Sequence, residues 1–242
     1  MFGQRGIYGV FGKPGRRRAE LPAAVKKHME MKKRLNLKSE LGRAEYVVFD
    51  TELTGLRMRS DSIVSIGAVR MRGGRIDIGD VFYRIVRPRT ELRGSSVVIH
   101  EITPTEAEQS PDIDTLLPEF LEFCGDSILV GHFVAIDLGF LNKEMQRLYG
   151  VSLQNAAADT GRIYRWLMRR GAGSCAFQGE TIEDLSLRTL AAKYGISVNG
   201  SHNALADAFV TAQIFQRLLS ELQGQGVKSV RELLRIGRHF KS

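Results

Sequence analysis

The chain has 242 residues, of which 43% are hydrophobic and 26% are charged, a composition typical of a globular protein with one sizeable core. The sequence contains no apolar run of about 18 residues, which excludes a membrane span, and no continuous apolar stretch near its start, so we expect no secretory signal. Cys124 and Cys175 fit neither a metal-binding spacing nor a disulfide framework, and we therefore expect a cytoplasmic protein.

The net charge of +8 is concentrated at the two ends of the chain. Residues 1–43 carry 12 Lys and Arg against 3 acids, and residues 228–242 carry 5 against 1. Basic ends are attracted to phosphate polymers or anionic surfaces, although a solvated tail has the same composition. We expect a basic extension at 1–43 that is partly disordered or helical, a folded domain at 44–222, and a short basic helix or tail at 223–242.

The folded part is predicted to begin with three strands. Tyr46–Phe49 is a short apolar run, and Ser62–Met71 and Ile76–Val86 are two further candidates separated by a hairpin turn at Arg72–Arg75. Helices are expected at 20–37, from Thr103–Pro104, and at 112–123, 135–149, 162–170, 185–194, 204–222 and 230–234, with a short strand at 127–130. This order predicts an α/β domain with a mixed central sheet and flanking helices.

Two acids, Asp50 and Glu52, stand at the end of the first predicted strand. Residues i and i+2 of an extended chain project to the same side, and two adjacent carboxylates repel unless a proton or cation lies between them. Strand ends are also where α/β sheets bind ligands. The pair therefore indicates a divalent metal site with oxygen ligands, although the same two acids could simply end a strand at the surface.

Three further residues have side chains suited to the same chemistry. Asp137 falls in the first turn of the helix that follows a strand ending in glycine, where it could supply a carboxylate or only cap the helix. Asp207 lies beside the apolar stripe of the longest predicted helix, and a buried carboxylate there needs a partner such as a cation. His202 stands at the start of that helix, where it could be a base or an exposed cap.

Together these residues form a set suited to phosphodiester hydrolysis. Four carboxylates can hold two divalent ions about 3.5–4 Å apart, which clamp the attacking and leaving oxygens of an in-line displacement. A neutral histidine, with an ordinary pKa of about 6.5, can accept the remaining proton near neutral pH.

Three segments resemble the three motifs of the DnaQ-like 3′→5′ exonucleases, in the branch with a histidine in the third motif. They are FDTELTG at 49–55, VGHFVAIDLGFL at 130–141 and HNALADA at 202–208, and VIHEIT at 98–103 is similar to a further family segment. This branch includes the proofreading epsilon subunit of bacterial DNA polymerase III. The resemblance covers about residues 44–222, which would make that part an exonuclease domain with an RNase H-like fold.

The resemblance implies two Mg²⁺ or Mn²⁺ ions and a role for each of the five residues. Asp50, Glu52 and Asp207 would bind one ion, Asp50 would bridge to the second, and Asp137 would bind directly or through water. His202 would be the general base.

The resemblance also implies contacts with substrate. Leu53, Thr54 and Gly55 would line the 3′-terminal nucleotide, and His100, His132 and Phe133 would contribute further contacts. The family often has Thr where this chain has Leu53, Asn in place of Phe133 and Gly in place of Glu101. We expect the first two departures to alter how the last sugar and base are held.

The expected substrate is a single-stranded or frayed 3′ end of nucleic acid, most simply DNA, from which nucleoside 5′-monophosphates are released. Two alternatives remain open at this point: an exoribonuclease that trims RNA, and a non-catalytic module that binds nucleic acid or a polymerase through its basic ends. A DNA polymerase or another replication or repair protein is a possible partner, and no membrane is expected.

Overall fold

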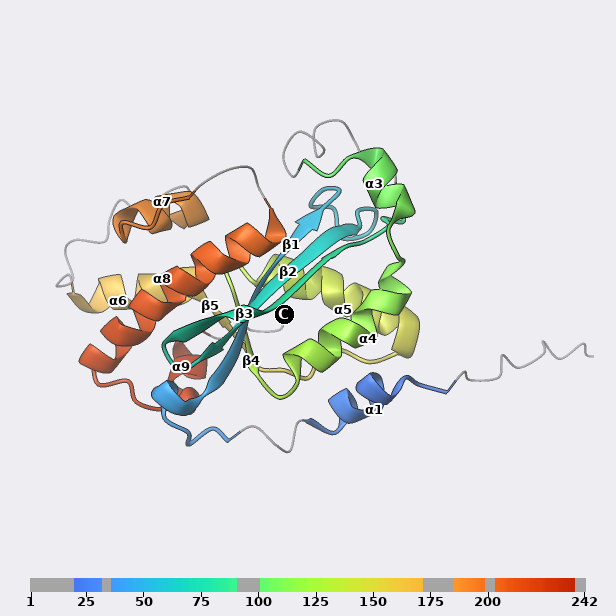
Figure 1. Cartoon of the computed structure of the whole chain (residues 1–242). Coiled ribbons are helices and arrows are strands. Elements are labelled where there is room, and N and C mark those ends of the chain that lie inside the picture. Colours follow the sequence, from blue (N-terminus) through green and yellow to red (C-terminus); the bar gives the residue numbers. More distant parts are fainter. Residues whose placement is uncertain (1–19, 32–35, 91–100, 172–184, 199–202, 238–242) are drawn as a thin grey trace, which may run out of the picture.

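The computed structural model describes residues 20–31, 36–90, 101–171, 185–198 and 203–237 (Figure 1). The predicted site residues His100 and His202, and also Cys175, lie outside these ranges. The strands are β1 (Glu45–Leu53), β2 (Ile63–Arg72), β3 (Arg75–Ile85), β4 (Ile128–Gly131) and β5 (Ala157–Asp159). The helices are α1 (Ala23–Met29), the 3-10 turn η2 (Leu41–Arg43), α3 (Pro104–Gln109), α4 (Ile113–Cys124), α5 (Ala135–Tyr149), α6 (Thr160–Gly171), α7 (Leu187–Lys193), α8 (Ala204–Gly224) and α9 (Val230–Gly237).

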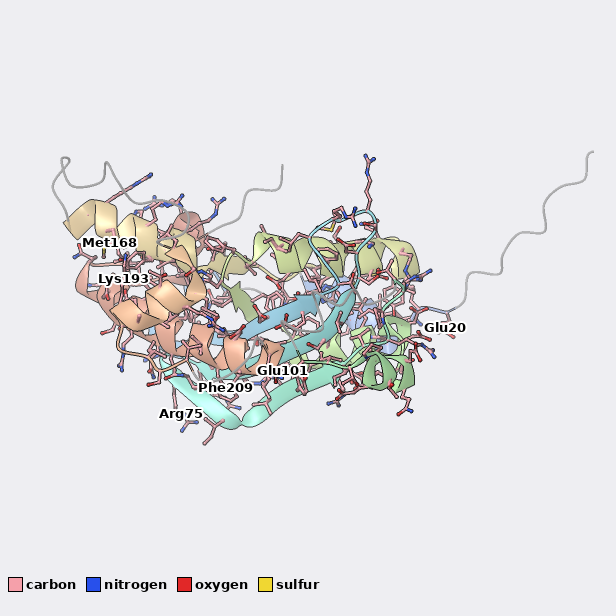
Figure 2. All side chains as sticks on the ribbon, turned by 90° about the horizontal axis from the view of Figure 1, so that it is seen from above. Glu20, Arg75, Glu101, Met168, Lys193 and Phe209 are labelled. Carbon is pink, nitrogen blue, oxygen red and sulfur yellow. The ribbon has the colours of Figure 1, made fainter. Side chains whose placement is uncertain are left out.

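The five strands form one mixed sheet in the order β3-β2-β1-β4-β5. The β1–β2 and β2–β3 pairs are antiparallel, and the β1–β4 and β4–β5 pairs are parallel. Arg75 marks the start of the outermost strand in Figure 2, where side chains fill the space between the sheet and its helices. The predicted mixed sheet with an antiparallel three-strand start and flanking helices is confirmed.

Alternation along β1 creates a core on each face of the sheet. Tyr46 and Val48 pack on one side, beneath α8, where the Tyr46 ring meets that of Phe215 with centroids 5.0 Å apart. Val47 and Phe49 pack on the other side, beneath α4 and α5. All four side chains are fully buried, so β1 is covered on both faces up to the point where residues 50–53 reach the end of the sheet.

Segments on both sides of the predicted domain limits contribute to these cores. Val25 of α1 is fully buried in the cluster that contains α4, and Leu41 joins the cluster beneath α8. Val230 and Leu233 of α9 are buried in that same cluster. The limits 44–222 stay a prediction, but the packed unit in the described ranges includes residues before and after them.

Two element predictions differ from the structure. Among the described residues of the predicted helix at 20–37, the α-helix α1 covers Ala23–Met29. β5 was not predicted because Ala-Ala-Asp contains no β-branched or aromatic residue. The predicted start at Thr103 is confirmed, since its Oγ1 accepts the Glu106 N–H at 3.2 Å. Within the described ranges, none of the helices has the length and apolar character needed to cross a membrane.

Candidate active site

Three of the predicted acids meet where β1 ends beneath the first turns of α8. Asp50 and Glu52 lie two apart on β1 and follow Tyr46 and Val48 on the face covered by α8. Asp207 faces them from α8. Each of the three offers one carboxylate oxygen, and these oxygens all lie within 4.8 Å of one another.

The fourth acid, Asp137, approaches from the opposite face of β1. It lies in the first turn of α5 and is 6% exposed. Thr51 projects to that face, and its N–H and Oγ1–H both donate to Asp137 Oδ1, at 3.1 and 2.5 Å. β1, which carries Asp50 and Glu52, therefore also holds Asp137 through Thr51, the residue between those two acids.

Burial and mutual repulsion disfavour ionisation of these carboxylates in the metal-free protein. The pKa of Asp50 is raised well above its ordinary value by burial first and then by Asp137, Glu52 and Asp207. Burial, with Asp207 and Asp137, raises the pKa of Glu52 to about 7. Burial also raises the pKa of Asp137 to about 6, although the Thr51 hydrogen bonds oppose that shift.

This donor set fits divalent cations that prefer oxygen ligands. A largely buried group of carboxylates with raised pKa values is stabilised by a proton or by a cation, and two ions would remove the repulsion that four acids create. Asp50, Glu52 and Asp207 could hold one such ion, and the charge of Asp137 acts on both Asp50 and Glu52.

Asp159, at the end of β5, fixes the segments that carry Asp137. Its Oδ2 accepts the Val134 N–H at 3.0 Å and its Oδ1 accepts the Arg162 N–H at 3.1 Å, so one carboxylate caps the starts of both α5 and α6. It is 3% exposed, and its charge adds to the raised pKa of Asp137.

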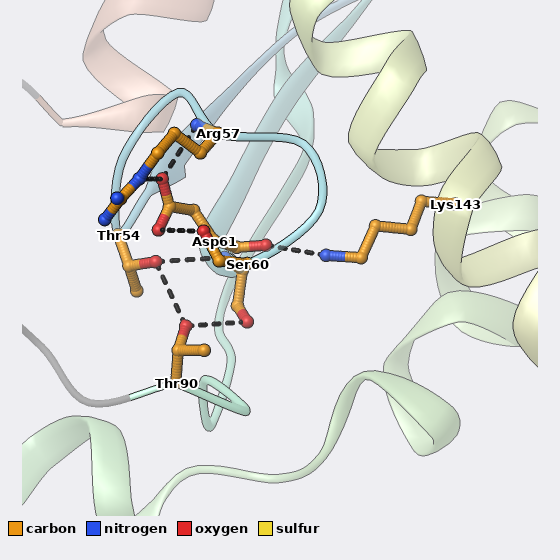
Figure 3. A network of polar contacts seen from close by, with 7 residues as sticks. Thr54, Arg57, Ser60, Asp61, Thr90 and Lys143 are labelled. Carbon is orange, nitrogen blue, oxygen red and sulfur yellow. Dashed lines mark hydrogen bonds and ion pairs between the residues drawn. The ribbon is translucent and has the colours of Figure 1, made fainter.

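The predicted nucleotide-lining residues begin a loop between β1 and β2 that is braced by polar contacts (Figure 3). Leu53 packs partly into the core beneath α4, whereas Thr54 is 5% exposed and its Oγ1 accepts the Ser62 N–H at 2.9 Å. A Cβ on Gly55 would lie 2.5 Å from Asp61 Oδ2, so only glycine leaves room for that carboxylate. Lys143 of α5 reaches across to donate to the Asp61 carbonyl at 2.7 Å.

His132 is engaged within the protein through both ring nitrogens. Nε2 donates to the Leu185 carbonyl at 2.7 Å, and Nδ1 lies 2.9 Å from Thr160 Oγ1. Burial lowers the pKa of His132. Its contact with substrate stays a prediction, and the geometry favours a role in joining β4, α6 and the segment before α7.

The two non-glycine residues with positive φ among those described are Phe133 (φ 53°) and Glu101 (φ 59°). These are positions where the resembled family often has Asn and Gly, residues that adopt the left-handed conformation more readily. The Phe133 ring packs beside His132, with centroids 4.4 Å apart, and would lie 3.3 Å from a Cβ on Gly161. The departure therefore places an aromatic ring in the turn that leads to Asp137.

Sequence reasoning missed Thr51, Asp159 and Asp61. The role of Thr51 could have been predicted, because a residue between two acids on a strand covered on both faces must point its hydroxyl to the opposite face. Asp159 follows a strand that was itself missed, and the partners of Asp61 become apparent only when the loop is closed.

Comparisons with known proteins cover most of this chain. The sequence model of the exonuclease family matches residues 47–215. The DNA polymerase III subunit epsilon of Aquifex aeolicus is 34% identical over 190 residues, which cover 78% of this chain and 88% of that protein. The PolC-type DNA polymerase III of Clostridium perfringens is 34% identical over 192 residues, which cover 78% of this chain but 12% of that longer protein.

Solved structures show the same fold at lower identity. Escherichia coli exonuclease I in complex with a dT13 oligonucleotide superimposes with a TM-score of 0.62 and 17% identity, covering 76% of this chain and 43% of that one. Exonuclease X in complex with 5′ overhanging duplex DNA gives a TM-score of 0.57 and 22% identity, covering 79% of this chain and 99% of that one. The mixed sheet and its helices are therefore RNase H-like.

Proposed function

The chain belongs to the exonuclease family, and from this premise we propose that it is a metal-dependent 3′→5′ exonuclease that releases nucleoside 5′-monophosphates from single-stranded or frayed DNA ends. The observation that carries the proposal is the group of three carboxylates from β1 and α8 within 4.8 Å of one another. Such a cluster, half-buried at a sheet end, supplies the charge that two divalent ions require.

In this proposal Asp50, Glu52 and Asp207 would hold one ion, and Asp50 and Asp137 would hold the second, Asp137 directly or through water. Mg²⁺ and Mn²⁺ suit these oxygen donors. When bound, the two ions supply the positive charge that activates water and stabilises the leaving oxygen.

The protein's own groups orient the reaction and move its proton. Thr51 keeps Asp137 aimed and favours its ionised form. His202 accepts the proton of the water whose oxygen forms the new bond to phosphorus, while the bond from phosphorus to the 3′ oxygen of the preceding nucleotide breaks. Leu53, Thr54 and Gly55 line the terminal nucleotide, with His100 and Phe133 beside them.

DNA is the proposed substrate because the named relatives are DNA polymerase III proteins and the superimposed nucleases hold DNA. Membership of the family favours an enzyme over a non-catalytic binding module. A DNA polymerase or another replication or repair protein is the proposed partner, since the related sequences are parts or subunits of polymerases. A cytoplasmic location completes the proposal, in line with the cysteine pattern.

The test is digestion of a 5′-labelled single-stranded oligonucleotide, as DNA and as RNA, with Mg²⁺ or Mn²⁺. We expect a ladder of shortened DNA products that depends on the metal and is lost in Asp207→Asn. Asp126→Asn is the matched control, because Asp126 is exposed before β4, at the opposite end of the sheet. Metal-independent shortening, or full activity of Asp207→Asn, would refute the proposal, and faster RNA digestion would reassign the substrate.

A further inference from the structure

A row of three residues crosses the sheet beneath the start of α8. Asp50 of β1 lies opposite Gly67 of β2, and Gly67 lies opposite Tyr83 of β3. Residues directly opposite one another share a face, so all three belong to the face that α8 covers. A proposed metal ligand and a tyrosine thus lie on either side of a glycine.

Gly67 makes room for the helix. A Cβ at this position would lie 2.2 Å from both the Ala204 carbonyl carbon and the Leu205 nitrogen. The first turn of α8 therefore rests directly on the bare backbone of β2, between the strand that carries Asp50 and the strand that carries Tyr83.

Asn203 connects that first turn to Tyr83. Its Oδ1 accepts the Leu205 and Ala206 N–H groups at 3.0 and 3.2 Å, and its Nδ2 donates to Tyr83 Oη at 3.2 Å. Because the two backbone donors require the amide oxygen, the amide nitrogen must face the phenol, and the phenol oxygen must accept. One end of the amide caps α8, and the other end anchors it to the outer strand.

We infer that Tyr83 is a positioning residue for the proposed exonuclease reaction: its hydroxyl anchors the start of α8 and so sets the place of Asp207 in the acid cluster. This inference rests on the proposed function and extends it to a strand that carries none of the motif residues.

The environment of Tyr83 suits a neutral hydrogen-bond partner. Burial raises its pKa, the hydrogen bond from Asn203 opposes that shift, and the charges of Glu106 and Glu52 add to it. The phenol therefore stays protonated at neutral pH, and the charge of Glu52 acts on it.

Tyr83→Phe removes only the anchoring oxygen. A hydrogen bond of this kind corresponds to about 2- to 10-fold in an equilibrium or rate constant. We expect kcat to fall by about that factor with KM little changed, Mn²⁺ affinity to weaken severalfold, and the Leu205 and Ala206 amides to exchange faster with solvent. Tyr164→Phe is the matched control, because it removes a phenol oxygen that bonds Lys193 Nζ at 3.1 Å, between α6 and α7.

A double-mutant cycle separates the anchor from the cap. Asn203→Ser keeps an N-cap oxygen but loses the donor to Tyr83. If the anchor is the cause, Tyr83→Phe adds no further loss of kcat in the Asn203→Ser background. Additive losses, or wild-type exchange and Mn²⁺ affinity in Tyr83→Phe, would overturn the inference. Should the wild-type chain not shorten DNA, the proposed function fails, while amide exchange and Mn²⁺ affinity still decide whether Tyr83 positions α8.

Discussion

Replacing Thr51 with valine tests how the fourth acid is kept ready for a cation. The change removes a hydroxyl that donates to Asp137 Oδ1 at 2.5 Å and leaves the backbone N–H, the side-chain shape and β1 intact. A hydrogen bond to a charged group contributes about 1.5–3 kcal/mol, and one pKa unit corresponds to about 1.4 kcal/mol. Since the pKa of Asp137 is about 6 with the bond in place, its loss should raise that pKa by about 1 to 2 units.

Protonated Asp137 competes with the cation, so the effect of Thr51→Val must depend on pH. We expect Mn²⁺ affinity, measured by titration calorimetry, to fall by about 2- to 10-fold near pH 7 and to approach that of the wild type near pH 9. Thr115→Val is the control, because Thr115 is exposed on α4 and makes the same chemical change away from the acids. An affinity gap of equal size at both pH values would refute the electrostatic reasoning.

Three further outcomes follow from the packing and charge of the site. Gly67→Ala should displace the first turn of α8, because its methyl would lie 2.2 Å from Leu205 N. We expect this variant to bind Mn²⁺ more weakly than the wild type, and unchanged Mn²⁺ affinity would show that the helix adapts. Because the pKa of Glu52 is about 7 in the fold against an ordinary 4.5, the folded state holds more protons between these values, and the free energy of unfolding of the metal-free protein should fall by up to about 3 kcal/mol as the pH rises through them. Saturating Mg²⁺ should therefore raise the melting temperature more at pH 8 than at pH 5, and equal shifts in thermal scans would contradict this. Removing residues 1–31 should lower the free energy of unfolding by about 2 kcal/mol or more, because Val25 is fully buried against α4; a truncated chain of wild-type stability in urea would show that α1 contributes nothing.

The sequence predicted most of the fold where a periodic pattern was long or a turn was distinctive. β1 to β3, α4, α5 and α8 have such patterns, and their order was enough for a mixed sheet. β5 was not predicted because Ala157, Ala158 and Asp159 have low strand propensity, although parallel pairing with β4 holds them extended. The predicted helix at 20–37 is longer than α1 among the described residues, because lysine-rich composition favours a helix over more residues than those that pack against α4.

The acids of the candidate site were predictable because each stands beside an apolar segment that does not itself require a charge. Asp50 and Glu52 end a strand, Asp137 begins a helix, and Asp207 lies beside the apolar stripe of another helix. The side chains that aim them were not predictable. Thr51, Asp159 and Tyr83 act across 86, 25 and 120 positions of the chain respectively, through partners that no local pattern names. Hydrogen bonds between residues so far apart in the chain can be identified only when the order of the strands in the sheet is known.

α8 has a consequence for genetic screens of this enzyme. One helix carries Asp207 in its first turn and continues as a fully buried stripe through Phe215 to Leu222. A substitution in the buried stripe near the C-terminal end of α8 can be accommodated only if the whole helix rotates or shifts, because the interior is close-packed. A screen for loss of nuclease activity should therefore yield substitutions along the length of α8 as well as at the acids themselves. Second substitutions that refill the buried side of α8 should restore both thermal stability and nuclease activity.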